Sequence, residues 1–200
     1  MSWSESALLA VLILGAALWV VWVAASRLDR LHHKVVASRI ALQAQLERRA
    51  RTAVDLAASG LLDPASAVLL ADAAFATSAA AERPLGEAGP STSEAFALTG
   101  LAPERERAES ALSVTLRSVL DDAESVAALR TSPPGDELLG DLASVWYRAQ
   151  LARRFHNEAV AQAQRARRHR PVRWLRLAGR APLPRTVELD DQMPGALDRP

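Results

Sequence analysis

Hydrophobic residues follow two patterns along this chain. From Ala7 to Ala25 the sequence ALLAVLILGAALWVVWVAA contains no charge, no amide and no proline. Beyond it, apolar residues recur every three or four positions among charged ones, which is the period of an amphipathic helix. Period-two runs of β-branched and aromatic residues, which are typical of strands, do not occur in the sequence. The pattern predicts an all-α chain in which one apolar segment precedes a set of amphipathic helices.

The apolar segment 7–25 has the length and composition of a transmembrane helix. Its nineteen residues would rise about 28 Å, close to the roughly 30 Å hydrocarbon core of a bilayer. A cleaved signal peptide is disfavoured because the segment is too long and because the stretch before it has Glu5 but no Lys or Arg. A buried core helix would normally show a polar stripe. We therefore predict a single-pass membrane anchor.

Charges on either side of the anchor predict its orientation. No Lys or Arg precedes the segment, whereas four basic residues follow it closely: Arg27, Arg30, Lys34 and Arg39. The positive-inside rule then places residues 1–6 outside the cell and the remainder of the chain in the cytoplasm. Indole rings favour the headgroup level of a bilayer. The residues expected at the membrane interface around the anchor are Trp3, Trp19, Trp22, Arg27 and Arg30.

The body of the chain, 26–169, is predicted to form four helices in one domain. The first helix should continue from the anchor and end at Gly60, and Asp63 followed by Pro64 is typical of a helix start. A segment rich in Gly and Pro, 83–102, should be a loop or an insertion. Apolar stripes on the two long outer helices favour an antiparallel four-helix bundle. The expected helices are 26–59, 64–82, 103–130 and, after the breaker Pro133-Pro134-Gly135, 136–169.

The last part of the chain, 170–200, is predicted to be a basic segment followed by an extended tail over 182–200. Eight arginines and no acid lie between 165 and 185. Each cation near an anionic leaflet contributes about 1 kcal/mol, so this stretch is predicted to make a second membrane contact. A solvated basic helix end and phosphate binding on a nucleic acid stay open as alternatives. The residues assigned to the contact are Arg165, Arg167, Arg168, Arg170, Arg173, Trp174 and Arg176.

No reaction chemistry is predicted. Adjacent His32 and His33 would diverge by about 100° on a helix and could not chelate one metal ion together. His156 lies on an expected core stripe, where a buried histidine is the simpler interpretation. The sequence contains no phosphate-binding glycine loop, nucleophile elbow or EF-hand pattern. We therefore predict no catalytic residue, no metal and no cofactor.

Two stretches resemble the LemA family. Gln45-Leu46-Glu47-Arg48-Arg49 is similar to the Q-L-x-R-R signature of the first soluble helix of that family, and RRFHNEAV from Arg153 to Val160 is similar to R-x-[FY]-Y-N-x-A-V. Pro171 and the residues after it look like the F-P turn and the end of the family pattern. Val54-Asp55 and Ala163-Gln164 depart from it, as in a divergent member.

The resemblance implies a membrane-anchored four-helix bundle and no established reaction. It implies structural roles for Gln45, Leu46, Arg48, Arg49, Arg153, Phe155, Asn157, Val160 and Pro171. For Asn157, a hydrogen bond to another helix and plain exposure to solvent stay open as alternatives.

The sequence favours a scaffold or protein-interaction module at the cytoplasmic face of a bacterial cell membrane. Its expected partners are the lipid bilayer and either another protein or a second copy of the chain. One alternative is an accessory subunit of a membrane-associated enzyme or protease system. The least favoured alternative is a nucleic-acid tether that uses the basic stretch.

Overall fold

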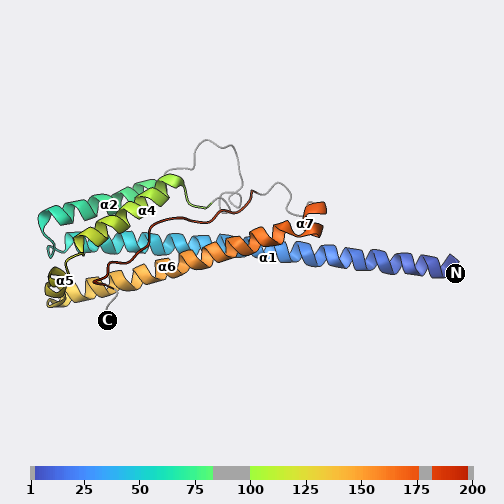
Figure 1. The fold of residues 1–200 in the computed structure, drawn as a ribbon, viewed down its shortest axis with the longest axis horizontal. Coiled ribbons are helices and arrows are strands. Elements are labelled where there is room, and N and C mark those ends of the chain that lie inside the picture. Colours follow the sequence, from blue (N-terminus) through green and yellow to red (C-terminus); the bar gives the residue numbers. More distant parts are fainter. Residues whose placement is uncertain (1–2, 83–99, 176–181, 198–200) are drawn as a thin grey trace.

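The structure is a computed structural model that describes residues 3–82, 100–175 and 182–197. These residues form helices, turns and extended segments, and no strand occurs among them. The predicted all-α class is confirmed for this part of the chain. Figure 1 shows an elongated molecule in which one long helix projects far beyond the rest.

Helix α1 (Trp3–Ala58) is a single helix of 56 residues that contains both the apolar segment and the first body helix. None of its described residues before Leu28 is buried. From Leu28 onward, buried residues recur at helical spacing, among them Val35, Leu42, Ala53 and Leu56. The helix ends before Gly60, which has a φ of +73°, a left-handed conformation that glycine adopts without steric cost. The predicted continuity of this helix with the apolar segment and its predicted end are both confirmed.

Helix α6 (Pro133–Arg168) packs along the body part of α1. Lys34 pairs with Gln162, Ser38 pairs with His156, and Leu56 shares a core cluster with Leu139. Residue numbers therefore rise along α1 as they fall along α6, so the C-terminal end of α6 lies near the apolar segment (Figure 1).

The predicted start of this helix at Asp136 is wrong, because Pro133-Pro134-Gly135 forms the first turn. Ser132 precedes that turn, and its hydroxyl accepts a hydrogen bond from the Gly135 N–H at 3.3 Å. Proline lacks only an N–H that the first turn does not use, so a Pro-Pro pair can begin a helix as readily as it ends one.

Helices α2 (Pro64–Glu82) and α4 (Pro103–Val119) lie beside the C-terminal half of α1, and α2 lies between α1 and α4. Helix α2 begins as predicted, because the Asp63 carboxylate accepts hydrogen bonds from the backbone N–H groups of Ala65 and Ser66. The predicted loop 83–102 lies mostly outside the described residues. Its last three residues, 100–102, are not helical.

The third predicted helix, 103–130, is wrong in its length. The structure divides it into α4 and a short helix, α5 (Ala123–Arg130), with a break at 120–122. The Asp122 carboxylate accepts hydrogen bonds from the N–H groups of Glu124 and Ser125 and so begins a new helix. The side chain of an aspartate competes with the backbone for hydrogen bonds, which favours a cap over a helix interior.

Residues 182–194 form an extended segment that ends in a turn at 195–197, and we call 182–197 the C-terminal strap. The predicted extended tail over 182–200 is confirmed for 182–194 only, since 198–200 lie outside the described residues. The strap also belongs to the core, because Val187 is fully buried and Leu197 is only 5% exposed. Among the described elements, the backbones of α4 and α6 do not lie next to each other. The strap runs between them (Figure 1) and bonds to side chains of both.

Candidate functional site

The projecting part of α1 is the first candidate functional surface. Its apolar window has a mean hydropathy of 2.6 and no buried residue, and it is long and apolar enough to cross a membrane. Its indole rings are well exposed: 93% for Trp3, 65% for Trp19 and 62% for Trp22. Helix α2 passes the same test of length and composition, with a mean hydropathy of 1.3. It packs between α1 and α4, but only 17% of its apolar window is buried.

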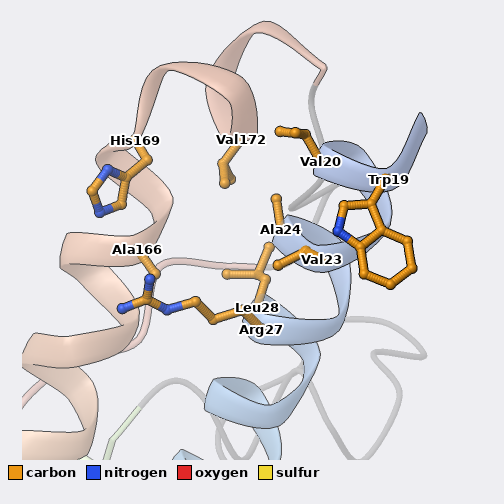
Figure 2. A pocket seen from close by; sticks show the side chains of 9 residues that line it. All are labelled: Trp19, Val20, Val23, Ala24, Arg27, Leu28, Ala166, His169 and Val172. Carbon is orange, nitrogen blue, oxygen red and sulfur yellow. The ribbon is translucent and has the colours of Figure 1, made fainter. Parts of the chain in front are cut away.

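The C-terminal end of α6 and helix α7 (Arg170–Trp174) close against α1 where the projecting part begins. Val172 is 6% exposed and packs with Leu28 and Ala166. Figure 2 shows Val20, Ala24, Leu28 and Val172 pointing toward one another from the two sides. The cavity between them has a volume of about 360 Å³ and is lined by Trp19, Val20, Val23, Ala24, Arg27, Leu28, Ala166, His169 and Val172. The last turns of the predicted anchor and the residues just beyond it thus face the predicted second contact.

Most of the predicted interface residues occur at this end of the molecule with accessible side chains. Arg27, Arg30, Arg165, Arg168 and Arg173 are exposed. The exposed fraction of Trp174 is 92%. Arg167 is half-buried and donates a hydrogen bond to the carbonyl oxygen of Pro182 at 2.6 Å, so it holds the start of the strap. Arg170 and Pro171 lie in α7, and Arg176 lies outside the described residues. The fold therefore gathers two basic segments that are far apart in sequence.

A buried arginine forms a second feature, in the middle of the body. Arg49 is fully buried, and its guanidinium donates to the Glu109 carboxylate at 2.9 Å, to the Glu109 carbonyl oxygen at 3.0 Å and to the Ser113 hydroxyl at 3.0 Å. Arg105 approaches the other carboxylate oxygen of Glu109 at 3.6 Å. A buried charge is tolerated only where it is paired and hydrogen-bonded. This cluster ties α1 to α4.

Trp146 connects this cluster to the strap. The guanidinium carbon of Arg49 lies 5.1 Å from the centre of a Trp146 ring, which is a cation–π distance. The indole N–H of Trp146 donates to the carbonyl oxygen of Asp191 at 2.8 Å. Sequence reasoning selected Arg49 from a motif but missed Glu109, Ser113 and Trp146. No local spacing could have revealed them, because they are brought to Arg49 only by the packing of α4 and α6.

The second LemA-like stretch faces the strap. Arg153 forms two hydrogen bonds with the Asp191 carboxylate, at 2.7 and 2.9 Å. The Asn157 amide donates to the carbonyl oxygen of Val187 at 3.1 Å and accepts from its N–H at 2.9 Å. Neither alternative for Asn157, a bond to another helix or plain exposure, is correct, because the extended strap occupies the position opposite this half-buried side chain. A side-chain amide matches the donor and acceptor of one extended residue.

The remaining motif residues divide between core and surface. Leu46 and Val160 are buried, Gln45 is half-buried, and Arg48 is exposed beside the buried Arg49. Phe155 is 58% exposed, so its ring does not contribute to the core. Arg48 and Phe155 are the motif residues that could meet a partner.

His156 belongs to the buried core of the body. His156 is fully buried, and one of its ring nitrogens, Nδ1, lies 3.1 Å from the Ser38 hydroxyl. Burial lowers the pKa of His156 below its ordinary value, and the positive charge of Arg39 lowers it further. Within the described parts of the chain, no group of three His, Cys, Asp or Glu side chains could hold a metal ion.

In comparisons with known proteins, no protein-family model, no curated protein and no solved structure matches the chain.

Proposed function

We propose that the chain is a single-pass membrane protein whose helical body is a scaffold or protein-interaction module without a reaction of its own. The body extends into the cytoplasm of a bacterial cell as an antiparallel four-helix bundle closed by the strap. The LemA-like motifs support this architecture, since Leu46, Arg49 and Val160 lie in the core and Arg153 and Asn157 hold the strap, although Arg48 and Phe155 are exposed. One observation carries the proposal: the exposed apolar segment and the body share one uninterrupted helix, α1.

The basic end of the body would make the second membrane contact. Val172 packs on Leu28, about 5 Å of helix rise beyond Ala25. Arg173 and Trp174 project from the same short helix into solvent. A segment that combines exposed cations with an exposed indole suits the headgroup region of an anionic leaflet.

The far end of the body offers a surface for a protein partner. On α2, the side chains of Val68, Leu69 and Phe75 are each more than 60% exposed. Exposed apolar clusters of this kind are typical of protein-interaction sites. By helix rise, the end of α1 at Ala58 lies about 50 Å from the end of the anchor, so this surface would meet partners away from the bilayer.

Cysteine labelling tests the topology, because the chain contains no cysteine. Ser4→Cys reports on the N-terminus, and Ser118→Cys reports on an exposed position of α4. A membrane-impermeant thiol reagent applied to intact cells should label position 4 and should label position 118 only after lysis. Labelling of position 118 alone in intact cells would refute the cytoplasmic placement. Labelling of both positions would refute the anchor.

A polarity-sensitive dye tests the second membrane contact. Trp174→Cys carries the dye, and Ser118→Cys carries it as a control that the proposal places far from the bilayer. In nanodiscs with anionic lipids, the dye at position 174 should emit at shorter wavelength than in neutral nanodiscs, while the control does not change. Equal emission at position 174 in the two lipids would exclude an electrostatic membrane contact.

A further inference from the structure

The groove between α4 and α6 holds the C-terminal strap in the way that a binding site holds a peptide. We propose that this groove is a binding site for an extended acidic segment of a partner protein, and that the strap is the competitor that occupies it within the chain. The inference deepens the proposed interaction role of the body and rests on it, but it does not depend on the membrane anchor or its orientation.

Side chains of the groove form hydrogen bonds with the main chain of the strap. The hydrogen bonds come from both walls and reach seven strap positions. From α6, they join Trp146 and Gln150 to Asp191, Asn157 to Val187, Gln164 to Pro184 and Arg167 to Pro182; from α4, they join Glu106 to Glu188, Ser110 to Asp190 and Arg117 to Gln192. Because these bonds end on backbone atoms, any extended peptide of the same register can make them.

Two kinds of side-chain contact add selectivity. Val187 is fully buried among Leu42, Leu46, Leu101 and Ala149. Asp190 pairs with Arg117 on α4, and Asp191 pairs with Arg153 on α6, so each wall supplies one guanidinium for one carboxylate. The spacing of these anchors defines the ligand.

The partner segment is therefore extended, with an aliphatic residue followed three and four positions later by two acids. Arginine–carboxylate pairs with two parallel hydrogen bonds are among the stronger polar contacts in proteins. The position after the aliphatic residue needs no particular side chain, because Glu188 is exposed and the nearby charge that acts on it is the like charge of Glu106.

The contacts of the strap permit exchange. It adds no strand to a sheet, since its hydrogen bonds are made to individual side chains, and Leu183, Arg185, Thr186, Glu188 and Gln192 are exposed. A tethered segment competes at an effective concentration in the millimolar range. The intact chain should therefore resist a free peptide, and a cut between α7 and the strap should remove that advantage while leaving every contact in place.

The experiment uses the full chain in detergent micelles with a protease site inserted within 176–181. A labelled peptide of residues 182–197 is titrated by fluorescence anisotropy before and after cleavage. We expect saturable binding that is at least about tenfold tighter after cleavage. The Asp191→Asn peptide should bind roughly tenfold or more weakly than the unchanged peptide, since it loses a charged pair. The Glu188→Gln peptide is the matched control and should bind within about twofold of the unchanged peptide.

Three results would overturn the inference. In the first, the cut strap stays in place and no labelled peptide enters, which makes the strap a permanent part of the core. In the second, the peptide binds equally before and after cleavage, which places it outside the groove. In the third, the Asp191→Asn and Glu188→Gln peptides bind equally well. None of these outcomes depends on topology, so a failure here is distinguishable from a failure of the labelling experiment.

Discussion

Replacing Arg49 by methionine should strongly destabilise the body of the protein. Methionine has a similar reach but no charge, so the packing volume is largely kept while the polar contacts are lost. The three hydrogen bonds to Glu109 and Ser113 disappear, and so does the contact with the Trp146 ring. Among the described residues, the Glu109 carboxylate, whose residue is 1% exposed, keeps Arg105 at 3.6 Å as its only cationic partner.

The magnitude follows from the burial of the pair. Removing one partner of a buried ion pair typically costs about 3–5 kcal/mol, because the other charge is left without compensation. Small domains are stable by only about 5–15 kcal/mol. With a denaturant slope of about 2 kcal/mol per molar urea, the unfolding midpoint of the body should fall on the order of 2 M.

Urea unfolding in micelles, followed by circular dichroism, measures this change. Arg48→Met is the matched control: it changes the neighbouring, exposed arginine of the same motif and should alter the free energy of unfolding by less than about 0.5 kcal/mol. The double variant Arg49→Met with Glu109→Met should be more stable than the sum of the single effects implies, by about 2 kcal/mol. Equal effects of Arg48→Met and Arg49→Met, or additive effects of Arg49→Met and Glu109→Met, would refute the reasoning.

Three further predictions concern other parts of the body. Burial lowers the pKa of His156, so the unfolded chain takes up a proton before the folded one as the pH falls below about 6.5. The free energy of unfolding, measured by urea titration, should therefore decline from pH 7 to pH 5, and His156→Gln should reduce that decline. Asn157→Ala removes both hydrogen bonds to Val187. It should lower the free energy of strap opening, measured by amide exchange, by about 1–2 kcal/mol, whereas Phe155→Ala should leave that free energy unchanged. Gly135→Ala would place a Cβ 2.1 Å from the Leu129 carbonyl oxygen and should destabilise the body by about 1–3 kcal/mol; Gly140→Ala, with open space around it, should stabilise it slightly, and thermal unfolding of the two variants checks the contrast.

Local signals explain what could be predicted from the sequence. Asp63 and Pro64 mark the start of α2, Gly60 marks the end of α1, and the structure places both boundaries there. The break at 120–122 was missed because the apolar spacing from Leu116 to Val126 is compatible with one helix, while the Asp122 cap interrupts it. Periodicity describes the face of a helix but not whether the helix is continuous.

Contacts between distant residues explain the rest. An extended segment has no helical period, so no sequence pattern in residues 182–197 indicates that Val187 is buried. The partners of the strap are 15 to 82 positions away in sequence, and Arg49 is 60 positions from Glu109. Motif resemblance did select Arg49, Arg153 and Asn157, but the groove that gives Arg153 and Asn157 a shared role exists only once α4 and α6 are in place.

Strap and buried cluster are physically linked through Trp146. One side of this indole meets the Arg49 guanidinium, and its N–H holds the Asp191 carbonyl oxygen. An empty groove would leave that N–H without its partner and would open the surroundings of Arg49 to water, weakening the ion pair with Glu109 as the local dielectric rises. A peptide that replaces the strap restores both conditions. Occupancy of the groove is thus coupled to the stability of the contact between α1 and α4, which gives the body a physical means of registering whether an acidic segment is bound.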